Sequence, residues 1–177
     1  FAILASGALA VAAQVDNRPI TWTALVHSAV DGSALKKNAG CDGCADAGAT
    51  SEQRLEAGDG YAEFTVGEEG PFWVAGLGAG AGGTAIADID FAFRFNGSGQ
   101  ADVLESGVYA GGDTPYAAGD TFRIAVVDGR VHYSRNGARL KESEKRPQYP
   151  LRLDVTLGTA GASVRDARLV TFGGGSH

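Results

Sequence analysis

Two cysteines, Cys41 and Cys44, are the residues whose type and spacing most directly suggest chemistry in this chain. A Cys-x-x-Cys pair can bind zinc, cycle as a redox dithiol, or close a disulfide. Zinc needs two further ligands, and none of the three histidines stands at zinc-finger spacing. A redox pair normally opens a helix after a strand, whereas these cysteines lie in the small-residue stretch 38–49. The spacing favours a structural disulfide, with a reduced, inert pair as the alternative.

A disulfide between Cys41 and Cys44 closes a very short ring. Chain-entropy arguments give such a ring only ~2 kcal/mol, so it would fix a loop and would not hold the fold together. Disulfides persist in oxidising compartments. The sequence therefore predicts a protein that lies outside the cell or on the cell surface.

Other patterns that would indicate catalysis or nucleotide binding are incomplete. The glycine-rich stretch 76–83 lacks the Gly-Lys-Ser/Thr of a phosphate-binding loop, and no helical pattern follows it. No Gly-x-Ser-x-Gly elbow occurs, and His27 and His132 are expected at the surface, at a strand end and on a strand's outward face. A net charge of −6 without a Lys/Arg cluster argues against nucleic acid or an anionic membrane as a partner.

Residues 119–140 carry the clearest structural pattern. Apolar residues alternate with others from Phe122 to Val126, which is the period-two pattern of a half-buried strand. Asp128-Gly129 then supplies two residues that tolerate positive φ in a tight hairpin turn. The alternation resumes on the returning strand, and Asn136-Gly137 gives a second turn of the same kind. The pattern predicts an antiparallel meander.

Further strands are expected at residues 20–26, 61–66, 72–77, 86–95, 101–105, 151–157 and 162–172. One face of the first should carry Ile20, Trp22, Ala24 and Val26. In residues 86–95 the expected inward residues are Ile89, Phe91, Phe93 and Phe95, and the outward ones are Asp88, Asp90, Ala92 and Arg94. A turn is expected at Asp31-Gly32 and a short helical turn at 51–55. About ten to thirteen strands at this spacing predict an all-β, two-sheet antiparallel jelly-roll sandwich.

The hairpin region also resembles a known superfamily. Residues 119–137, GD-x-F-R-I-x-V-x-D-G-x-V-x-Y-S-x-N-G, followed by Pro150-Leu151, are similar to the central hairpins of concanavalin A-like jelly rolls, particularly SPRY-like bacterial surface domains. Upstream similarity lies at Trp22, residues 32–37 (GSALKK), residues 47–61 and Glu63-Phe64. The resemblance extends over roughly residues 20–170 and implies a fold without fixing a function, because this fold hosts lectins, glucanases, lyases and protein-binding modules.

Glucanases of this fold carry Glu-x-Asp-x-Glu on one strand, which places a nucleophile and an acid about 5 Å apart. This chain offers Asp88-x-Asp90-x-Ala92, without a glutamate and with alanine in the third place. We interpret Asp88 and Asp90 as an outward charge ladder that pairs with Arg94 or faces solvent. The chain is therefore expected to have no catalytic residues and not to be an enzyme.

The resemblance to lectins implies a sugar site made of an aromatic ring with Asp and Asn on loops. The candidates are Tyr109, Asp113 and Tyr116, with Asn136 and Trp73 as possible neighbours. The alternative is that both tyrosines cover the sandwich edge and that Trp73 is core. Legume-type calcium loops are denser in Asp and Asn than any stretch here, so no metal and no other cofactor is expected.

Residues 1–13 form an apolar arm with one polar residue, Ser6. Such a stretch is typical of a signal-peptide h-region, and it is too short to span a membrane, which takes about 20 residues. Because the chain contains no Met, we expect the arm to belong to the mature fold. It would be an extra strand of its own sandwich, or a strand donated to a neighbouring copy. The arm residues expected to mediate self-association are Phe1, Ile3, Leu4, Leu9 and Val11.

The predicted organisation is an arm and hinge at 1–19, a jelly roll at 20–172, and a flexible tail at 173–177. The preferred function is a non-catalytic extracellular protein that self-associates through residues 1–15, as a homo-oligomer, a filament or a pilus-like subunit. The alternative is a monomeric, lectin-like glycan-binding module for adhesion.

Overall fold

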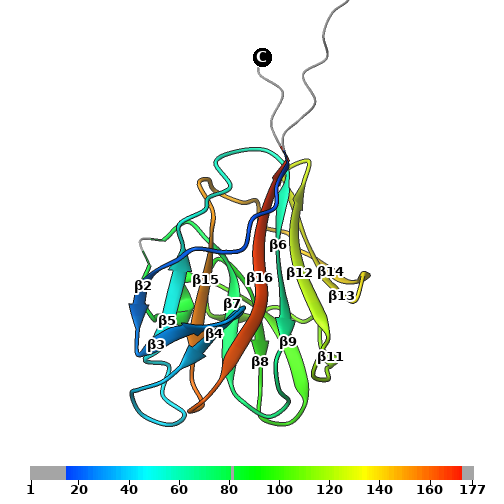
Figure 1. Cartoon of the computed structure of the whole chain (residues 1–177). Helices are drawn as coiled ribbons and strands as arrows, with labels where there is room; N and C mark the ends of the chain where they lie inside the picture. Colours follow the sequence, from blue (N-terminus) through cyan, green and yellow to red (C-terminus); the bar gives the residue numbers. More distant parts are fainter. Residues whose placement is uncertain (1–14, 81, 173–177) are drawn as a thin grey trace, which may run out of the picture.

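The computed structural model of this chain describes residues 15–80 and 82–172 and shows two antiparallel sheets packed as a sandwich (Figure 1). The first sheet runs in the order β14 (Ala138–Glu142), β13 (Arg130–Arg135), β12 (Thr121–Val127), β6 (Gly60–Val66), β16 (Ser163–Phe172), β4 (Ala34–Lys37) and β3 (Ser28–Asp31), with β1 (Val15–Asp16) paired to β16. The second sheet runs in the order β10 (Val108–Tyr109), β9 (Gln100–Glu105), β8 (Phe91–Phe95), β7 (Trp73–Gly78), β15 (Arg152–Leu157), β5 (Ala47–Ser51) and β2 (Trp22–Val26), with β11 (Thr114–Pro115) paired to β9. The predicted all-β, two-sheet fold is confirmed.

The predicted meander forms strands β12, β13 and β14. Asp128 and Gly129 have φ values of 49° and 73°, and Asn136 and Gly137 have 48° and 82°. Both pairs thus adopt the left-handed backbone that a two-residue hairpin requires, which Asn, Asp and Gly tolerate best. The local chemistry of these turns sets the register of the three strands.

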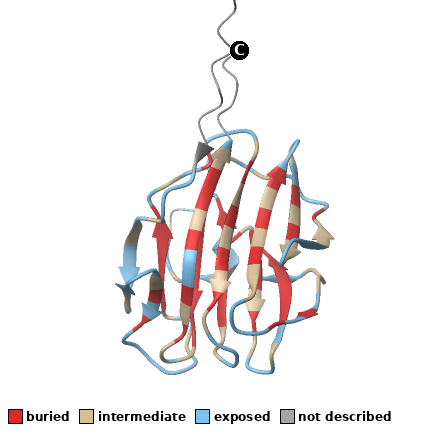
Figure 2. Cartoon of the chain, turned by 45° about the vertical axis from the view of Figure 1, so that its right-hand side comes forward, coloured by how far each residue is buried: buried red, intermediate tan, exposed pale blue. Residues whose placement is uncertain are grey.

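The core between the sheets is rich in aromatic rings. Trp73 and Phe95 stack with ring centroids 4.0 Å apart, and Phe93 meets Phe122 edge-on at 4.8 Å. Along the strands of Figure 2, buried residues alternate with more exposed ones, as period-two side-chain geometry requires. The inward orientation predicted for the phenylalanines of β8 is confirmed. Trp73 also belongs to this core and presents no exposed face to a ligand.

The outer face of the second sheet is covered by residues 82–90, here called the cover segment, which contains the 3-10 helix η1 (Ile86–Asp88). Thr156 donates a hydrogen bond of 3.1 Å from its hydroxyl to the backbone oxygen of Thr84. Ile89 is fully buried in a small apolar cluster with Val74 and Leu104, separate from the main core. Strands β5 and β7 are consequently buried along their whole length.

The cover segment corrects one expectation for residues 86–95. The strand begins only at Phe91, and Ile89 belongs to the second cluster and not with the inward phenylalanines. Asp88 lies in η1, and Asp90 accepts a hydrogen bond from the backbone N–H of Ala79 at 2.8 Å. The predicted charge ladder therefore does not exist, because the backbone leaves strand geometry just where the alternation was extrapolated.

The ladder's expected partner, Arg94, is also bound elsewhere. Its guanidinium donates to the Asp102 carboxylate, with an Nε–oxygen distance of 2.9 Å. Gly76 lies inside β7, within the strand predicted at residues 72–77. A Cβ at this position would collide with the backbone of Phe91 on the neighbouring strand, so the close approach of β7 and β8 requires glycine.

Strand β2 departs from the predicted alternation. A bulge between Thr23 and Val26 interrupts its pairing with β5, and Ala24 has φ of 51°. Ile20 and Trp22 pack against the core as expected, whereas Val26 is 38% exposed. Residues 51–55 also form no helical turn, since β5 continues through Ser51 and Leu55 bridges to Leu151.

The described part of the predicted hinge is already paired within its own chain. Val15 and Asp16 pair with Phe172 and Thr171 of β16, and Pro19 bridges to Arg168. The sandwich therefore begins before the predicted boundary at residue 20. The residues predicted to mediate self-association, from Phe1 to Val11, lie outside the described residues. No helix within the described ranges has the length and apolarity needed to cross a membrane.

Candidate functional site

Of the four predicted glycan-binding residues, the structure brings Tyr109 and Asp113 together. The Tyr109 hydroxyl donates a hydrogen bond to the Asp113 carboxylate. This bond raises the pKa of the Tyr109 phenol, because ionisation would place two negative charges side by side. The Tyr109 side chain is 56% exposed, so its ring is open to solvent at the β10 edge of the second sheet.

The other two predicted residues serve the fold. Tyr116 is 4% exposed, packs edge-on against Phe95, and donates a hydrogen bond to the backbone oxygen of Asn96 at 3.0 Å. Asn136 accepts the backbone N–H of Thr121 at 2.9 Å through its side-chain oxygen, while its amide donates to Asp120 at 3.0 Å. Neither side chain joins the Tyr109–Asp113 pair. A loop sequence shows that aromatic and amide side chains are present. It does not show which of them pack in the core or form hydrogen bonds within the fold.

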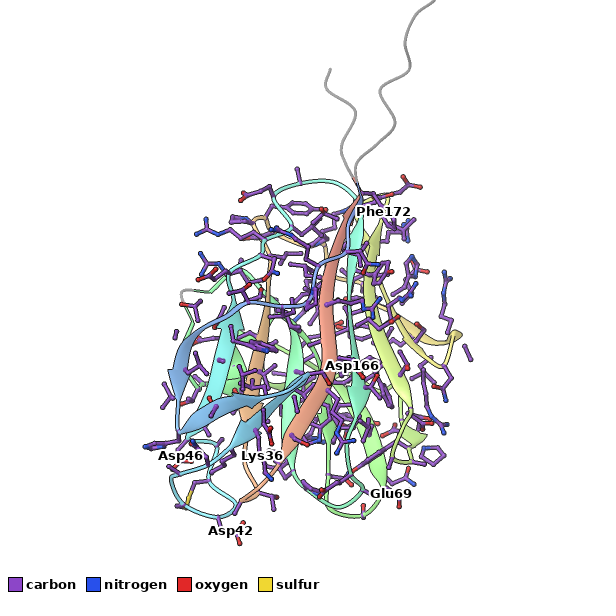
Figure 3. The ribbon with its side chains drawn as sticks, viewed as in Figure 1. Lys36, Asp42, Asp46, Glu69, Asp166 and Phe172 are labelled. Carbon is purple, nitrogen blue, oxygen red and sulfur yellow. A yellow bond between two sulfur atoms is a disulfide. The ribbon has the colours of Figure 1, made fainter. Side chains whose placement is uncertain are left out.

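Cys41 and Cys44 form the predicted disulfide, with Cα atoms 5.3 Å apart; the sulfurs lie near Asp42 and Asp46 in Figure 3. The loop around them is organised by Lys37, whose side chain is only 1% exposed. Its ammonium donates to the backbone oxygens of Cys41 at 2.6 Å and Cys44 at 2.9 Å, to that of Gly158 at 2.8 Å, and to Asp46 at 2.6 Å. The Lys37 bond lowers the pKa of the Asp46 carboxyl, assisted by the backbone N–H of Cys41. The buried ammonium thus replaces the solvent that the loop's acceptors would otherwise need.

The disulfide loop does not fit a metal ion. Ligand atoms of Cys41, Cys44 and Asp46 lie within 4.8 Å of one another, but the two sulfurs are bonded together. The Asp46 carboxylate is already neutralised by Lys37. A second cation at this place would repel the ammonium without gaining thiolate ligands.

Asp88 and Asp90 line an open polar cleft of about 380 Å³, with Lys145, Arg146 and Gln148 also on its walls. The two carboxylates come from η1 and from the residue just before β8. They therefore do not share one strand face, as the carboxylates of a glucanase of this fold do. Two acids at this spacing in the sequence are not enough to identify the glucanase arrangement.

The two histidines of the sandwich differ from each other. His27 is exposed between β2 and β3, and its Nδ1 lies 3.0 Å from the backbone oxygen of Asp46. His132 was expected on the surface, but its side chain is only 14% exposed. Its Nδ1 is buried, has no hydrogen-bond partner among the described residues, and lies 3.9 Å from Glu142. Neither histidine faces a nucleophile, and no catalytic constellation forms around them in the described part of the chain.

The sequence reasoning missed a buried acid, Asp154, on the outer face of the second sheet. It is 4% exposed and accepts a long hydrogen bond of 3.4 Å from the Thr50 hydroxyl. Burial raises the pKa of this carboxyl to about 7, and the charge of Asp88 acts in the same direction. The alternating pattern of residues 151–157 predicts the strand but carries no sign that the face bearing Asp154 is covered.

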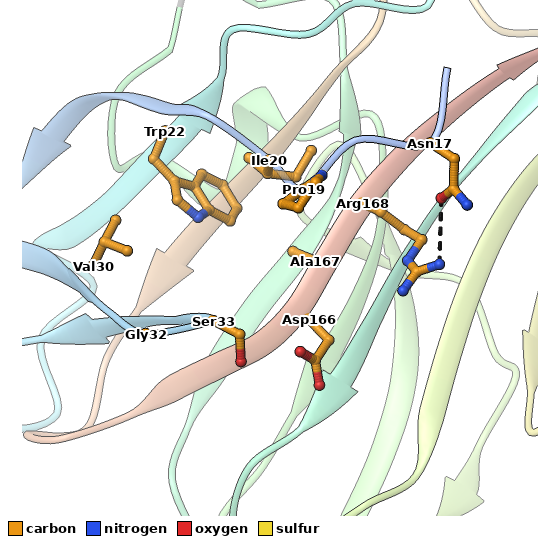
Figure 4. A pocket seen from close by; sticks show the side chains of 10 residues that line it. All are labelled: Asn17, Pro19, Ile20, Trp22, Val30, Gly32, Ser33, Asp166, Ala167 and Arg168. Carbon is orange, nitrogen blue, oxygen red and sulfur yellow. Dashed lines mark hydrogen bonds between the residues drawn. The ribbon is translucent and has the colours of Figure 1, made fainter. Parts of the chain in front are cut away.

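The reasoning also missed a pocket at the edge of the first sheet, here called the bulge pocket. It has a volume of about 150 Å³, and its lining residues are Asn17, Pro19, Ile20, Trp22, Val30, Gly32, Ser33, Asp166, Ala167 and Arg168. Figure 4 shows Trp22, Ile20 and Pro19 along one side and Ser33 and Asp166 along the other. One wall is therefore mainly apolar, and the opposite wall is polar.

A β-bulge in β16 builds the polar wall. The register of β16 against β6 shifts between Arg165 and Arg168, and Asp166 adopts φ of 49°. Positive φ is uncommon for a residue other than glycine, and bulges often re-aim a side chain at a binding site. The Asp166 N–H donates to the backbone oxygen of Ser33 at 3.0 Å, and the N–H of Ile20 donates to Ala167 at 3.3 Å. Both walls are thereby hydrogen-bonded to the bulge.

Three polar groups of the bulge pocket are free to bind a ligand. Among the described residues, the Asp166 carboxylate, the Ser33 hydroxyl and the Trp22 indole N–H have no hydrogen-bond partner. Arg168, at the far end, donates to the Asn17 side chain at 3.3 Å. The pocket thus offers an acceptor, a hydroxyl and a donor beside an aromatic and aliphatic surface. A volume of about 150 Å³ suits one small ligand or one unit of a larger one.

Comparison with known proteins gives a match in structure and none in sequence. No family profile matches the chain, and no curated protein resembles it in sequence. A human SPRY domain is 17% identical, with a TM-score of 0.62 over 82% of this chain and 97% of its own. The carbohydrate recognition domain of Emp46p is 10% identical, with a TM-score of 0.61 over 85% of this chain and 87% of its own. A Bauhinia forficata lectin in complex with GalNAc is 8% identical, with a TM-score of 0.59 over 90% of this chain and 96% of its own.

The fold is the concanavalin A-like jelly roll. At these identities the likeness concerns the fold alone, and both lectins and SPRY domains share it. The fold that the resemblance of the hairpin residues implies is confirmed. Within this concanavalin A-like sandwich, the bulge pocket is distinguished by an apolar wall facing unpaired polar groups.

Proposed function

We propose that this chain is a non-catalytic carbohydrate-binding module of the lectin type, and that the bulge pocket is its site. One observation carries the proposal: Trp22 and Asp166 line the same pocket with their polar groups unpaired among the described residues. The lectins and the carbohydrate recognition domain among its structural neighbours support the same class of function.

The chemistry of the pocket suits a sugar ring. The C–H face of a pyranose packs on aromatic and aliphatic surface, which Trp22, Ile20 and Pro19 supply. Sugar hydroxyls need acceptors and donors, and each charge-assisted bond to a carboxylate such as Asp166 is stronger than a neutral one. Because the backbone of the bulge is held by both walls, these groups are ordered before a ligand arrives.

The proposed location is outside the cell or on the cell surface. The Cys41–Cys44 disulfide supports it, because such bonds are rare in reducing compartments. Intact-mass measurement of the purified protein without reductant should show two hydrogens fewer than the reduced chain. Freely alkylated thiols in the native protein would remove this support.

The binding test is a glycan array followed by calorimetry on the best ligand. Trp22→Ala and Asp166→Ala should each weaken binding at least tenfold, which is about 1.4 kcal/mol. Trp22→Phe keeps a flat ring against the core and separates loss of binding from loss of folding. Glu144→Ala, an exposed acid in another loop, is the matched control and should bind normally.

Asp113→Ala compares the bulge pocket with the Tyr109–Asp113 pair. If Asp113→Ala abolishes binding and Asp166→Ala does not, the site is the β10 edge and our assignment is wrong. A parent protein that binds no glycan on the array would contradict the proposed function itself.

A further inference from the structure

We infer that the bulge pocket selects glycans that carry a protonated amine, such as glucosamine units, over their N-acetylated counterparts. The inference rests on the proposed function and specifies the ligand class of the same site. It follows from the charge of Asp166, the surface provided by Trp22, and the placement of Arg168, the one cation among the described residues that line the pocket.

Asp166 supplies the negative charge of the pocket wall. Its carboxylate has no ion pair or hydrogen bond among the described residues, as is also true of Asp31 of β3, whereas two other acids, on or next to strands β6 and β12, are paired. Glu63 pairs with Arg123 at 2.6 Å, and Asp120 with Arg135 at 2.8 Å. An unpaired acid that lines a pocket, and that sits on an uncommon backbone conformation, is suited to a cationic ligand group.

The surface opposite Asp166 is aromatic and aliphatic (Figure 4). Trp22 is the aromatic residue of the pocket, and an indole attracts a cation through its ring face. A cation between an indole and a carboxylate gains from both, and the apolar side chains of Ile20 and Pro19 reduce competition from water. An N-acetyl group would replace the charge with a neutral, bulkier amide in a pocket of only about 150 Å³.

Arg168 also lines the pocket, and its positive charge would repel an ammonium nearby. Its guanidinium is bound to the Asn17 side chain at 3.3 Å and lies at the far end of the opening from Trp22 (Figure 4). The amine is therefore expected at the Trp22–Asp166 end, and sugar hydroxyls at the Arg168 end. The net charge of −6 also favours encounter with a polycationic glycan.

The test compares two oligosaccharides that differ only at nitrogen: a glucosamine hexamer and an N-acetylglucosamine hexamer, titrated calorimetrically at mildly acidic pH. The native protein should bind the amine form at least tenfold more tightly. Raising the salt concentration should reduce that preference, because a partly exposed ion pair is screened.

Three variants assign the preference. Asp166→Asn, which keeps the shape of the side chain, should abolish the preference while retaining weak binding to both hexamers. Trp22→Phe should weaken binding of both hexamers and reduce the preference without abolishing it, because a phenyl ring attracts a cation less strongly than an indole. Glu144→Gln should change neither affinity. Circular dichroism melts of each variant show whether it is folded.

The possible failures are distinguishable. Equal binding of both hexamers by the native protein would overturn the inference while leaving the proposed glycan-binding function standing. Binding of neither hexamer, together with a signal elsewhere on the glycan array, would also overturn the inference alone. A preference that survives Asp166→Asn would show that another group recognises the amine.

Discussion

The outer faces of the two sheets are treated in opposite ways. The outer face of the second sheet lies beneath the cover segment, with a buried apolar cluster around Ile89 and a buried acid at Asp154. The outer face of the first sheet is open, and its charged side chains form pairs such as Arg123 with Glu63. An antiparallel sheet can have one face or both faces buried. Here the second sheet is buried on both faces, and the first is buried on its inner face only.

The contrast explains where a ligand can bind. A covered face offers no entry, so the polar groups of Thr50 and Thr156 are used internally. On the open face, some charges pair with each other, such as Arg123 with Glu63 and Arg130 with Glu142. The bulge pocket lies at the border of the open sheet, where residues 17–22 leave that sheet for the other and the bulge turns Asp166 outward. The unpaired polar groups of the bulge pocket therefore lie at the border between the open first sheet and the covered second sheet.

The largest expected effect concerns Asp154 and pH. Its pKa is about 7 in the folded protein and ~3.9 in an unfolded chain, so between these values the folded state binds more protons. Its contribution to the free energy of unfolding is fully present below about pH 4 and is lost as the pH rises through 7. The loss approaches about 4 kcal/mol for a shift of this size.

Asp154→Asn should remove this dependence. The variant should be more stable than the parent at pH 8 and similar to it at pH 4, as measured by urea unfolding at several pH values. In Asp88→Asn, the loss of unfolding free energy with rising pH should be smaller and should be complete at a lower pH, because Asp88 contributes to the raised pKa of Asp154. Equal stability of parent and Asp154→Asn at pH 8 would show that water reaches the covered face.

The next effect concerns the apolar cluster beneath the cover segment. Ile89→Ala should lower the free energy of unfolding by about 3 kcal/mol, the usual cost of a cavity at a fully buried isoleucine. Val30→Ala on the open edge, where the side chain is 54% exposed, should cost less than about 0.5 kcal/mol. Similar losses of unfolding free energy at Ile89 and Val30 would mean that the covered face and the open edge are equally exposed in solution.

Strands β6, β12, β13 and β16 of the first sheet, and β7, β9 and β15 of the second, were readable from sequence. Strands β3 and β4, and the cover over the second sheet, were not predicted. Turn residues such as Asp128-Gly129 act locally, so the meander follows from their chemistry alone. The cover segment depends on contacts distant in sequence, for example Thr84 with Thr156, which no local pattern encodes. This is why Ile89 was assigned to the wrong cluster.

The candidate site was less predictable than the fold for the same reason. Tyr109 and Asp113 were found because they are close in sequence. Trp22 and Asp166 meet only after the two ends of the chain pair along β16, and the positive φ of Asp166 has no local signal. Tyr116 looked like a ligand platform, but it fills the core next to Phe95.

A smaller effect is expected on the open face. Arg123 bonds Glu63 at 2.6 Å and lies 3.7 Å from the centre of the Tyr61 ring. A double-mutant cycle with Arg123→Ala and Glu63→Ala should give a coupling of roughly 0.5 kcal/mol, which decreases with added salt. The Arg123–Tyr61 cycle should retain more of its coupling in salt, because stacking also contributes. A coupling above about 2 kcal/mol for Arg123–Glu63 would indicate that this face is covered in solution.

The smallest effect on stability is expected from deleting residues 1–14, and it tests whether the first sheet stays open. The described residues form both sheets, and Val15 and Asp16 pair with β16 of their own chain. The deletion should therefore change the melting temperature by less than about 2 °C if the protein is a monomer. If the arm is donated to a neighbour, light scattering should show an oligomer for the parent and a monomer for the deletion variant. In that case a peptide of residues 1–14 should restore the lost stability of the variant. A monomeric parent whose deletion variant unfolds at a much lower temperature would contradict donation to a neighbour and the small effect expected here, and would instead support an arm that forms an extra strand of its own sandwich.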